Sequence, residues 1–450
     1  MDEFDELELH FCETCRPLFK EIKRLHKEQY ERLEARIIDL EEKNMKLEKR
    51  LLAYENAHTP PSRNFVRREK VEHPKTPGRQ KGHEGITRTF KNPDKTIPLT
   101  SKKCPFCHSH SITRMKTESR IIEDISEPVQ TNVTQFLVNH YKCKCCGKEF
   151  HTKHKDLPEE GDFGNNTLAE VSTMKFQDRL PYRKIQEALE RQYDLEITPA
   201  SILDFTRRVS DKLEEQYSQI FGLIRGSSYV YIDETSIEVN GVNYWIWIFV
   251  TATETLSIVR KSRGKNVVEE VLGKDYDGII ICDGWKAYPN FTDKIQRCWA
   301  HLLREAKFLS RKNEEAKLLS DRLHRLYKNL KFSLDKGPPD HIRTILKMNA
   351  EETMKELINK NYHSKEALKF VTKINNGFSH WFTFVTNPLI EPTNNIAERA
   401  MREHVIHRKI IGTLRNEKGT QIHERMMTCI ATWKQHGLNT REELLKCIRS

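Results

Sequence analysis

The chain has 450 residues, in which 76 lysines and arginines outnumber 65 aspartates and glutamates, giving a formal net charge of +11. This length predicts two or three domains, and the basic excess favours a polyanionic partner over a small neutral or acidic substrate. No apolar run approaches the roughly 18 residues of a membrane span, and the acidic start MDEFDELELHF is unlike a secretion signal. We therefore expect a soluble, cytoplasmic protein that is not inserted in a membrane.

An apolar heptad pattern lies near the N-terminus. Its a and d positions hold Leu33, Ile37, Leu40, Asn44, Leu47 and Leu51. An asparagine at an a position pairs best with the same asparagine of a second chain in a two-stranded parallel coiled coil. The pattern over residues 30–55 therefore predicts a homodimer. An amphipathic helix packed against its own protein is the alternative.

Residues 58–82 are rich in proline and positive charge. They contain four prolines and seven lysines or arginines against two glutamates, a composition that can neither hold a helix nor bury a core. We expect a flexible basic linker that can neutralise phosphates without reading bases. A linker that is merely solvated fits the composition equally well.

Two CxxC pairs follow the linker and suggest a structural zinc site. The four cysteines are Cys104, Cys107, Cys143 and Cys146, and the pairs are separated by 35 residues. A tetrahedral zinc ion takes four thiolates, each pair delivered from one tight turn, so we expect a zinc ribbon without a reactive position. The gap is longer than usual in ribbons, Cys145 and His151 offer substitute ligands, and unliganded thiols are the alternative.

Three helices are predicted between the zinc module and the next segment, over residues 167–180, 182–193 and 199–217. Thr198 as the N-cap and Pro199 in the first turn form a strong helix start. The arrangement resembles a DNA-binding helix-turn-helix, and a plain helical bundle is the alternative.

From Ser227 the pattern changes from helical to strand-like. Three strands are predicted first, with Asn240-Gly241 as a type I′ turn. A helix over about 265–272, the strand GIIICD, a helix starting near Gly284, a strand around 295–299 and a helix over 301–309 follow. This βββαβαβ order predicts a ribonuclease-H-like α/β core with mixed strand directions.

In that topology Asp233 ends the first strand and Asp283 ends the fourth, and these two strands are neighbours. Adjacent carboxylates repel unless a cation lies between them, and hard oxygen ligands suit Mg²⁺ or Mn²⁺. Glu398, in PTNNIAER, is the natural third carboxylate. Three carboxylates can hold two ions about 3.5–4 Å apart, which can activate the attacking oxygen and stabilise the leaving oxygen in phosphodiester displacement.

Four blocks carry a family resemblance. YIDET, ICDGWKAYPNF, QRCWAHLLREAKFL and PTNNIAERAMREHVIHRKIIGT resemble, in this order, the catalytic blocks of the insertion sequence 66 family of bacterial transposases. The upstream layout is similar too, so the resemblance covers most of the chain. It departs from the family in the linker sequence GRQKG and in the 83 charged, helix-forming residues 310–392.

The resemblance implies that Asp233, Asp283 and Glu398 are a catalytic (DDE) triad. The expected activity is Mg²⁺- or Mn²⁺-dependent cleavage and strand transfer at the ends of an insertion sequence, by an enzyme associated with the nucleoid. Its partners would be DNA at the element ends and the target, further copies of the chain in a homodimer or higher oligomer, and accessory transposition proteins such as some relatives use. A DNA-binding regulator derived from a transposase, and a ribonuclease-H-like nuclease without strand transfer, are the competing functions.

Several other side chains around the triad could matter. Rival carboxylates are Glu234, Asp275, Asp277 and Glu403. Glu234 neighbours Asp233 on a strand and should therefore point to the opposite face.

Basic residues follow Glu398. Arg402, Arg408 and Lys409 are the expected DNA-binding residues, with Arg402 one helical turn beyond Glu398 on the same face. A solvated helix face would have the same pattern. Cys298 and His301 form a CxxH motif at a helix start, for which we expect either a role beside the active site or a histidine packed in the core.

These features divide the chain into seven segments. They are an N-terminal helix (1–57), a basic linker (58–100), a zinc-binding domain (101–160), a helical DNA-binding segment (161–226), the first part of the core (227–309), a helical insertion (310–392), and the remaining core helices (393–450).

The zinc site can be tested by metal analysis. Freshly purified, reduced protein should contain about one zinc per chain, because four thiolates together satisfy the ion and fold this small segment. Less than half an equivalent would argue against the site.

Overall fold

The computed structural model describes residues 160–449 without a gap, most of 131–158, residues 106–111, residue 96 and parts of 17–44. Residues 31–37 and 39–44 are helical, with Leu33, Ile37 and Leu40 exposed. Leu47, Leu51 and the basic linker, except residue 96, lie outside the described residues. The coiled-coil dimer therefore stays a prediction.

The predicted zinc module is described only in part. Strands β1 (His140–Lys142) and β2 (Glu149–His151) pair antiparallel on either side of the second CxxC. Cys107 and Cys146 are exposed, whereas Cys104 and Cys143 lie outside the described residues. The zinc ligand set thus also stays a prediction.

The segment before the core is helical, as expected, but the single helix predicted over 199–217 is interrupted at Leu213 and forms two helices. Its helices are α3 (Asn165–Phe176), α4 (Tyr182–Tyr193), α5 (Pro199–Lys212) and α6 (Glu214–Arg225). The Thr198 hydroxyl accepts a hydrogen bond from Ser201 N and caps α5, with Pro199 in the first turn. The local start signal therefore fixes this boundary.

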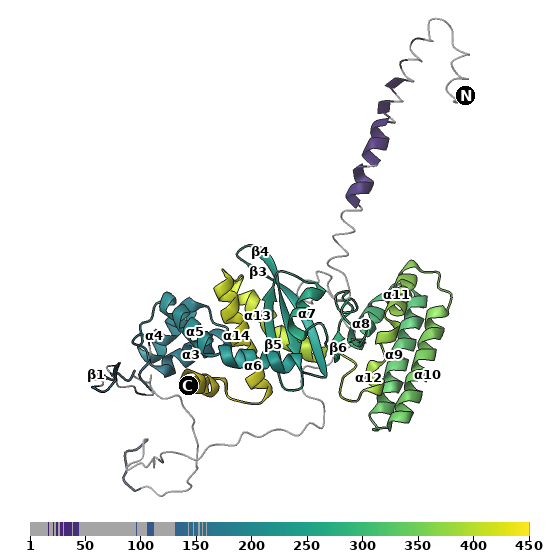
Figure 1. The fold of residues 1–450 in the computed structure, drawn as a ribbon. Helices are drawn as coiled ribbons and strands as arrows, with labels where there is room; N and C mark the ends of the chain where they lie inside the picture. The colour runs from purple at the N-terminus through teal and green to yellow at the C-terminus, as the bar shows by residue number, and fades with distance from the viewer. Residues whose placement is uncertain are drawn as a thin grey trace.

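A five-stranded mixed sheet forms the centre of the molecule (Figure 1). Its strands are β3 (Tyr229–Val239), β4 (Val242–Val250), β5 (Thr255–Arg260), β6 (Ile279–Cys282) and β7 (Ile295–Arg297), in the order β5-β4-β3-β6-β7. Strands β3, β4 and β5 pair antiparallel, and β6 pairs parallel with both β3 and β7. Asn240 and Gly241 supply the positive φ angles of the β3–β4 turn, 49° and 74°.

One predicted element of the core is wrong. Helix α7 (Lys265–Leu272) precedes β6 as expected, but turns occupy the segment after Asp283 where a helix was predicted. Gly284 and Pro289 disfavour a helix there. In addition, the Asp283 carboxylate accepts a hydrogen bond from Trp285 N at 2.8 Å, which stabilises a turn.

Helices cover both faces of the sheet. One core contains Ile232, Trp247 and Ile280 together with α3, α5, α6, α7 and α14 (Glu417–Gln435). The other contains Tyr231, Ile248 and Ile281 together with α8 (Trp299–Leu309) and α13 (Asn395–Ile411). Successive residues of β3 enter opposite cores, as strand geometry requires.

The edge strand β5 is closed by side chains of α14. Thr432, Thr428 and Glu424 accept hydrogen bonds from the backbone N–H groups of Thr255, Ser257 and Val259, at 3.2, 2.9 and 2.7 Å. The acceptors lie four residues apart on one helix face, and the donors lie two residues apart on one strand side. Helix α14 thus satisfies the donors that an edge strand otherwise exposes.

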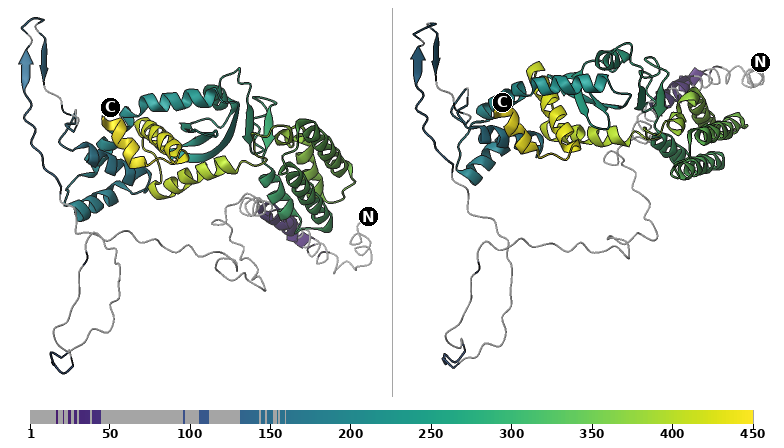
Figure 2. Two further views of the ribbon diagram at one scale, coloured as in Figure 1. Left: turned by 90° about the horizontal axis from the view of Figure 1, so that it is seen from below. Right: turned by 60° about the horizontal axis from the view of Figure 1, so that its bottom comes forward.

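The segment 310–392 is mainly helical, as its sequence predicts. It contains α9 (Glu314–Leu334), α10 (Asp340–Asn359), α11 (Lys365–Asn376), a 3-10 turn (Phe378–His380) and α12 (Thr383–Thr386). Figures 1 and 2 show α9–α11 gathered beside α8 at one end of the sheet, with α3–α5 at the other. The chain closes with α15 (Thr440–Arg449), and none of the described helices has the length and apolar composition to cross a membrane.

Three buried histidines pack between α13, α14 and α3. His404 Nδ1 lies 3.1 Å from His423 Nε2, and His407 Nε2 lies 3.4 Å from the Lys175 carbonyl oxygen. Burial, together with the neighbouring His407, lowers the pKa of His404 to about 3, and burial with the nearby Lys175 lowers the pKa of His407 to about 4. These side chains are neutral in the folded protein at physiological pH.

We predict that acid destabilises this cluster. Each histidine has an unfolded pKa near 6.5, so its stabilisation is complete above about pH 6.5 and is lost as pH falls toward the folded pKa, by about 1.4 kcal/mol per pH unit. His404→Gln should therefore reduce the pH dependence of the free energy of unfolding between about pH 6.5 and 5, measured in urea. The exposed His436 provides the control variant His436→Gln, and equal slopes for His404→Gln and the unmodified protein would contradict the prediction.

Candidate active site

Two of the predicted carboxylates lie on adjacent parallel strands. Strand β3 pairs with β6 through Tyr231 opposite Ile281, and two further residues in this register bring Asp233 opposite Asp283. The sequence placed Asp233 at the end of its strand, but β3 continues to Val239 by pairing with β4. Only the parallel pairing ends near Asp233, so the two carboxylates meet where β6 stops.

Glu398 comes from the first turn of α13, and the loop before this helix fixes its place. Asn394 Nδ2 donates to the Ile232 carbonyl oxygen at 2.8 Å, and Glu391 N donates to the Tyr231 hydroxyl at 2.8 Å. Both contacts join the loop to β3 beside Asp233. The start of α13 is therefore held at the strand that carries the first carboxylate.

The same loop is also joined to the start of α8. Asn394 N donates to Cys298 Sγ at 3.1 Å, and Trp299 N donates to the Pro392 carbonyl oxygen at 2.9 Å. Cys298 N in turn donates to the Cys282 carbonyl oxygen at 2.9 Å, next to Asp283. Strands β3 and β6 and helices α8 and α13 thus converge at one point.

The carboxylates at this point influence one another. Burial raises the pKa of Asp233 well above its usual value, and the neighbouring carboxylates of Glu234, Asp283 and Glu398 raise it further. Such mutual repulsion is relieved by a bound cation. The oxygen donors of Asp233, Asp283 and Glu398 are of the kind that Mg²⁺ and Mn²⁺ prefer.

Glu398 also faces α8. Its Oε1 lies 3.4 Å from His301 Nδ1, and its Oε2 lies 4.0 Å from Arg304 Nη2. Oε1 accepts no hydrogen bond from any residue that the structure describes. Within the described part of the chain, Cys298, His301 and Glu398 are the one group of three whose ligand atoms lie within 4.8 Å of one another, and Asp233 and Asp283 lie outside that group.

Glu234 points away from Asp233, as strand alternation predicts. Its buried carboxylate accepts hydrogen bonds from the Arg263 guanidinium at 2.8 and 3.0 Å, and from the Tyr288 hydroxyl. The Arg263 guanidinium lies between the rings of Trp245 and Trp285, 4.5 and 3.9 Å from their centroids. Glu234 is therefore neutralised by protein groups on the other face of the sheet.

The remaining rival carboxylates lie elsewhere. Asp275 and Asp277 precede β6, at the opposite end of the strand from Asp283. Asp277 pairs with Lys294, and Glu403 pairs with Arg179 at 2.6 Å.

The basic residues of α13 differ in their surroundings. Arg402 and Lys409 are exposed. Arg408 instead donates to the Ser236 carbonyl oxygen, and to the Thr235 hydroxyl at 3.1 Å. This contact fastens the last turns of α13 to β3, so in this structure the Arg408 guanidinium is engaged within the protein.

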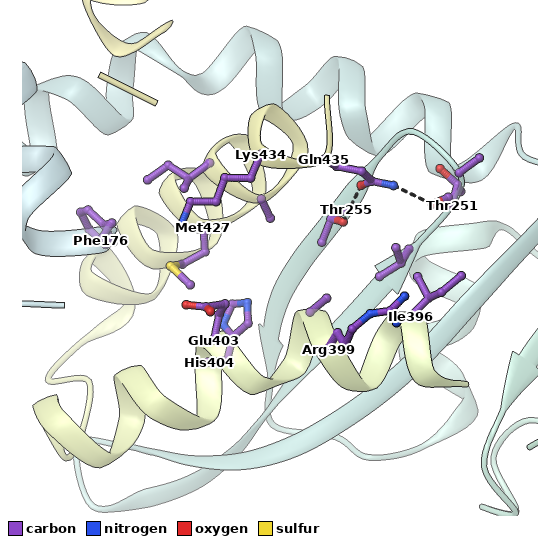
Figure 3. A pocket seen from close by; sticks show the side chains of 15 residues that line it. Phe176, Thr251, Thr255, Ile396, Arg399, Glu403, His404, Met427, Lys434 and Gln435 are labelled. Atoms are coloured by element: carbon purple, nitrogen blue, oxygen red, sulfur yellow. Dashed lines mark hydrogen bonds between the residues drawn. The ribbon is translucent and has the colours of Figure 1, made fainter. Parts of the chain in front are cut away.

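A separate cavity of about 450 Å³ lies beside α13 (Figure 3). Arg399 and Glu403 line it from α13, Met427 and Lys434 from α14, and Thr251 from the β4–β5 turn. Glu398 is not among its lining residues, because it projects from another side of the helix. The cavity is therefore distinct from the carboxylate site.

Comparison with known proteins identifies the family of this chain. The sequence matches the Transposase IS66 family over residues 160–422, a range that includes Asp233, Asp283 and Glu398. The chain belongs to this family. The resemblance expected from the four sequence blocks is thereby confirmed, and membership in this transposase family supports a transposase function with DNA as a partner.

Two relatives are similar to this IS66-family chain. The uncharacterized 48.3 kDa protein of insertion element ISM1 from Methanobrevibacter smithii is 25% identical over 332 residues, 70% of this chain and 79% of the relative. The uncharacterized protein y4qI of Sinorhizobium fredii (strain NBRC 101917 / NGR234) is 23% identical over 327 residues, 64% of this chain and 59% of the relative.

Sequence reasoning missed Asn394, the residue that joins the elements of this candidate site. An asparagine before a helix signals an N-cap, and Asn394 occupies that position, but its side chain forms no capping bond. It donates to β3 instead. A helix-start signal in sequence cannot distinguish these two uses.

We predict that Asn394→Ala weakens divalent-metal binding. The change leaves the buried Ile232 carbonyl without its donor, which should cost about 1–3 kcal/mol of stability, and releases the helix start that carries Glu398. Manganese affinity, measured by titration with the unmodified protein as reference, should fall about 10-fold or more.

Asn416→Ala is the matched control for this experiment. Asn416 caps α14 through a hydrogen bond from Gly419 N to its side chain, so its loss should cost about 1 kcal/mol without changing manganese affinity. Unchanged affinity in Asn394→Ala would show that the Asn394 contact does not position the site.

Proposed function

We propose that this chain is a metal-dependent DDE transposase that cleaves DNA at the ends of an insertion sequence and joins them to target DNA. The observation that carries the proposal is the convergence of Asp233, Asp283 and Glu398. They come from three distant parts of the sequence, yet the fold brings their supporting elements together through named hydrogen bonds. Membership in the IS66 family supplies independent support.

The sheet topology supports a ribonuclease-H-like core. Three antiparallel strands, followed by two strands parallel to the first, give the order β5-β4-β3-β6-β7. This order makes the first and fourth strands of the core neighbours. A site built on that pair receives one carboxylate from each strand.

The donor set suits magnesium or manganese. Asp233 and Asp283 would hold the ions between β3 and β6, and Glu398 would add a carboxylate from α13. Bound there, a pair of divalent ions would activate the attacking oxygen and stabilise the leaving oxygen in an in-line phosphodiester displacement. Burial and the neighbouring carboxylates raise the pKa of Asp233, and this cost of a negative charge at Asp233 is the local electrostatic reason that a cation fits.

Cationic side chains near Glu398 can hold the DNA backbone. Arg304 on α8 and Arg402 on α13 flank Glu398 and are each well exposed. Guanidinium groups bind phosphate oxygens in a bidentate manner, so these two residues would place a scissile phosphate beside the carboxylates. Lys409 extends the basic side of α13, whereas Arg408 contributes by fixing the helix.

Two successive reactions follow from one such site. Water first displaces the 3′ oxygen from the phosphate at the element end and leaves a free 3′-hydroxyl. That hydroxyl then attacks a target phosphodiester, and the target's own 3′ oxygen leaves. We expect the helical segment α3–α6, the basic linker and the zinc module to bind the DNA ends of the element. The N-terminal helix would pair two chains, and both reactions would take place on nucleoid DNA in the cytoplasm.

We predict that Asp233→Asn, Asp283→Asn and Glu398→Gln each reduce Mg²⁺-dependent cleavage and joining by more than about 1000-fold. Each change keeps the side-chain shape but removes a charge that holds a divalent ion. Binding to the end DNA should stay nearly intact, because it resides in other modules. The measurement uses labelled DNA from the flanks of the gene, with cleavage, joining and binding followed separately.

Glu234→Gln is the control, because Glu234 lies on the opposite face and pairs with Arg263. A thermal unfolding transition should first show that this variant is folded. Its loss of cleavage and joining should then be much smaller than that of the three triad variants. A Glu398→Gln protein that cleaves at the unmodified rate, or a folded Glu234→Gln protein as inactive as the triad variants, would contradict the proposal.

A further inference from the structure

Cys298, His301 and Glu398 form a second potential metal site beside the carboxylates. Their ligand atoms, one sulfur, one nitrogen and one oxygen, lie within 4.8 Å of one another. In a tetrahedral site with ordinary zinc bond lengths, ligand atoms are separated by about 3.3–3.8 Å. Small side-chain rotations would close the group to that size.

We propose that Cys298, His301 and Glu398 bind a thiophilic divalent cation such as Zn²⁺ or Co²⁺, separately from the Mg²⁺ ions expected at Asp233 and Asp283. Sulfur and imidazole ligands select such cations, whereas Mg²⁺ prefers oxygen ligands and water. Three protein ligands leave a fourth position open to solvent or substrate.

The backbone around Cys298 is arranged to stabilise a bound thiolate. Asn394 N donates a hydrogen bond to Cys298 Sγ at 3.1 Å. Hydrogen bonds of this kind favour the charged form of an acceptor. Burial nevertheless raises the pKa of Cys298, so a cation must displace the thiol proton to solvent, which thiophilic ions do far better than Mg²⁺.

Glu398 supplies the oxygen ligand without losing another partner. Its Oε1 already faces His301 Nδ1 at 3.4 Å and accepts no hydrogen bond within the described residues. His301 and Cys298 are placed by the first turn of α8, whose backbone is joined to the loop before α13. All three ligands therefore come from elements that are already fixed to one another.

Sharing Glu398 has a functional consequence that rests on the proposed function. A cation bound by Cys298 and His301 would hold the Glu398 carboxylate toward α8 and withhold it from Asp233 and Asp283. Thiophilic cations would then inhibit Mg²⁺-dependent cleavage by occupying a separate site. Glu398, which the Mg²⁺-dependent reaction needs as a metal ligand, would thus also mediate inhibition by the thiophilic cation.

Cobalt titration of the full-length protein without DNA tests the site. Co²⁺ bound to a thiolate gives a charge-transfer absorption, and the difference spectrum between unmodified protein and Cys298→Ser removes the contribution of the other cysteines. We expect this difference to saturate at about one cobalt per chain. His301→Ala, which keeps the thiol, should weaken this cobalt binding more than about 10-fold.

Two controls separate the site from its surroundings. Cys429→Ser changes a buried thiol of α14 outside the cluster and should leave the cobalt absorption unchanged. Asp233→Asn should also retain it, because Asp233 belongs to the other metal site. Identical cobalt spectra of the unmodified protein and folded Cys298→Ser would overturn the proposal. Unchanged cobalt affinity in His301→Ala would also overturn it, and this second variant tests the site if Cys298→Ser does not fold.

A second measurement tests the inhibitory consequence. The fold-inhibition by Zn²⁺ is the rate of Mg²⁺-dependent cleavage without added Zn²⁺ divided by the rate with it. This fold-inhibition should be high for the unmodified protein and at least about 10-fold lower for Cys298→Ser. Equal fold-inhibition of the two proteins would overturn the inhibitory consequence. Cobalt binding with no Mg²⁺-dependent cleavage at all would instead count against the proposed function and leave the cation site standing.

Discussion

The hydrogen bond from the Asn394 side chain to the Ile232 carbonyl oxygen is the contact on which the site depends. It joins residues 162 positions apart, at 2.8 Å, inside the protein. Ile232 precedes Asp233, and Asn394 begins the helix that carries Glu398. The Asn394 N–H also donates to Cys298, at the start of α8. Because a buried carbonyl without its donor costs about 1–3 kcal/mol, one residue holds strand β3 and both flanking helices in register.

The rest of the fold keeps that junction rigid. Arg408 fastens the far end of α13 to β3, so the helix cannot pivot freely about Asn394. Helix α14 satisfies the exposed N–H groups of β5 and anchors the edge of the sheet. Within this frame Glu398 has two sets of neighbours, Asp233 on one side and His301 with Arg304 on the other. Bound metal ions would determine whether the Glu398 carboxylate faces Asp233 or faces His301 and Arg304.

Local signals predicted much of the fold. The helices Tyr182–Tyr193 and Lys265–Leu272 were predicted at their observed bounds, and Asn240-Gly241 forms the expected turn. The helix predicted after Asp283 is wrong, because Gly284, Pro289 and the Asp283–Trp285 hydrogen bond favour turns. The sequence suggested which carboxylates to group, but not that Asn394 joins them or that Glu398 faces Cys298 and His301. Those contacts link residues far apart in the chain, and local sequence patterns do not predict contacts between distant residues.

The proposed metal site is tested most directly by a crystal structure of the protein with an element-end DNA and Mn²⁺, in which anomalous scattering locates the ions. We expect manganese between Asp233 and Asp283, with the Glu398 carboxylate turned away from α8 to complete the site and the Asn394–Ile232 hydrogen bond intact. Manganese bound away from Asp233 and Asp283, or Glu398 excluded from the ions while DNA is in place, would contradict the proposed site.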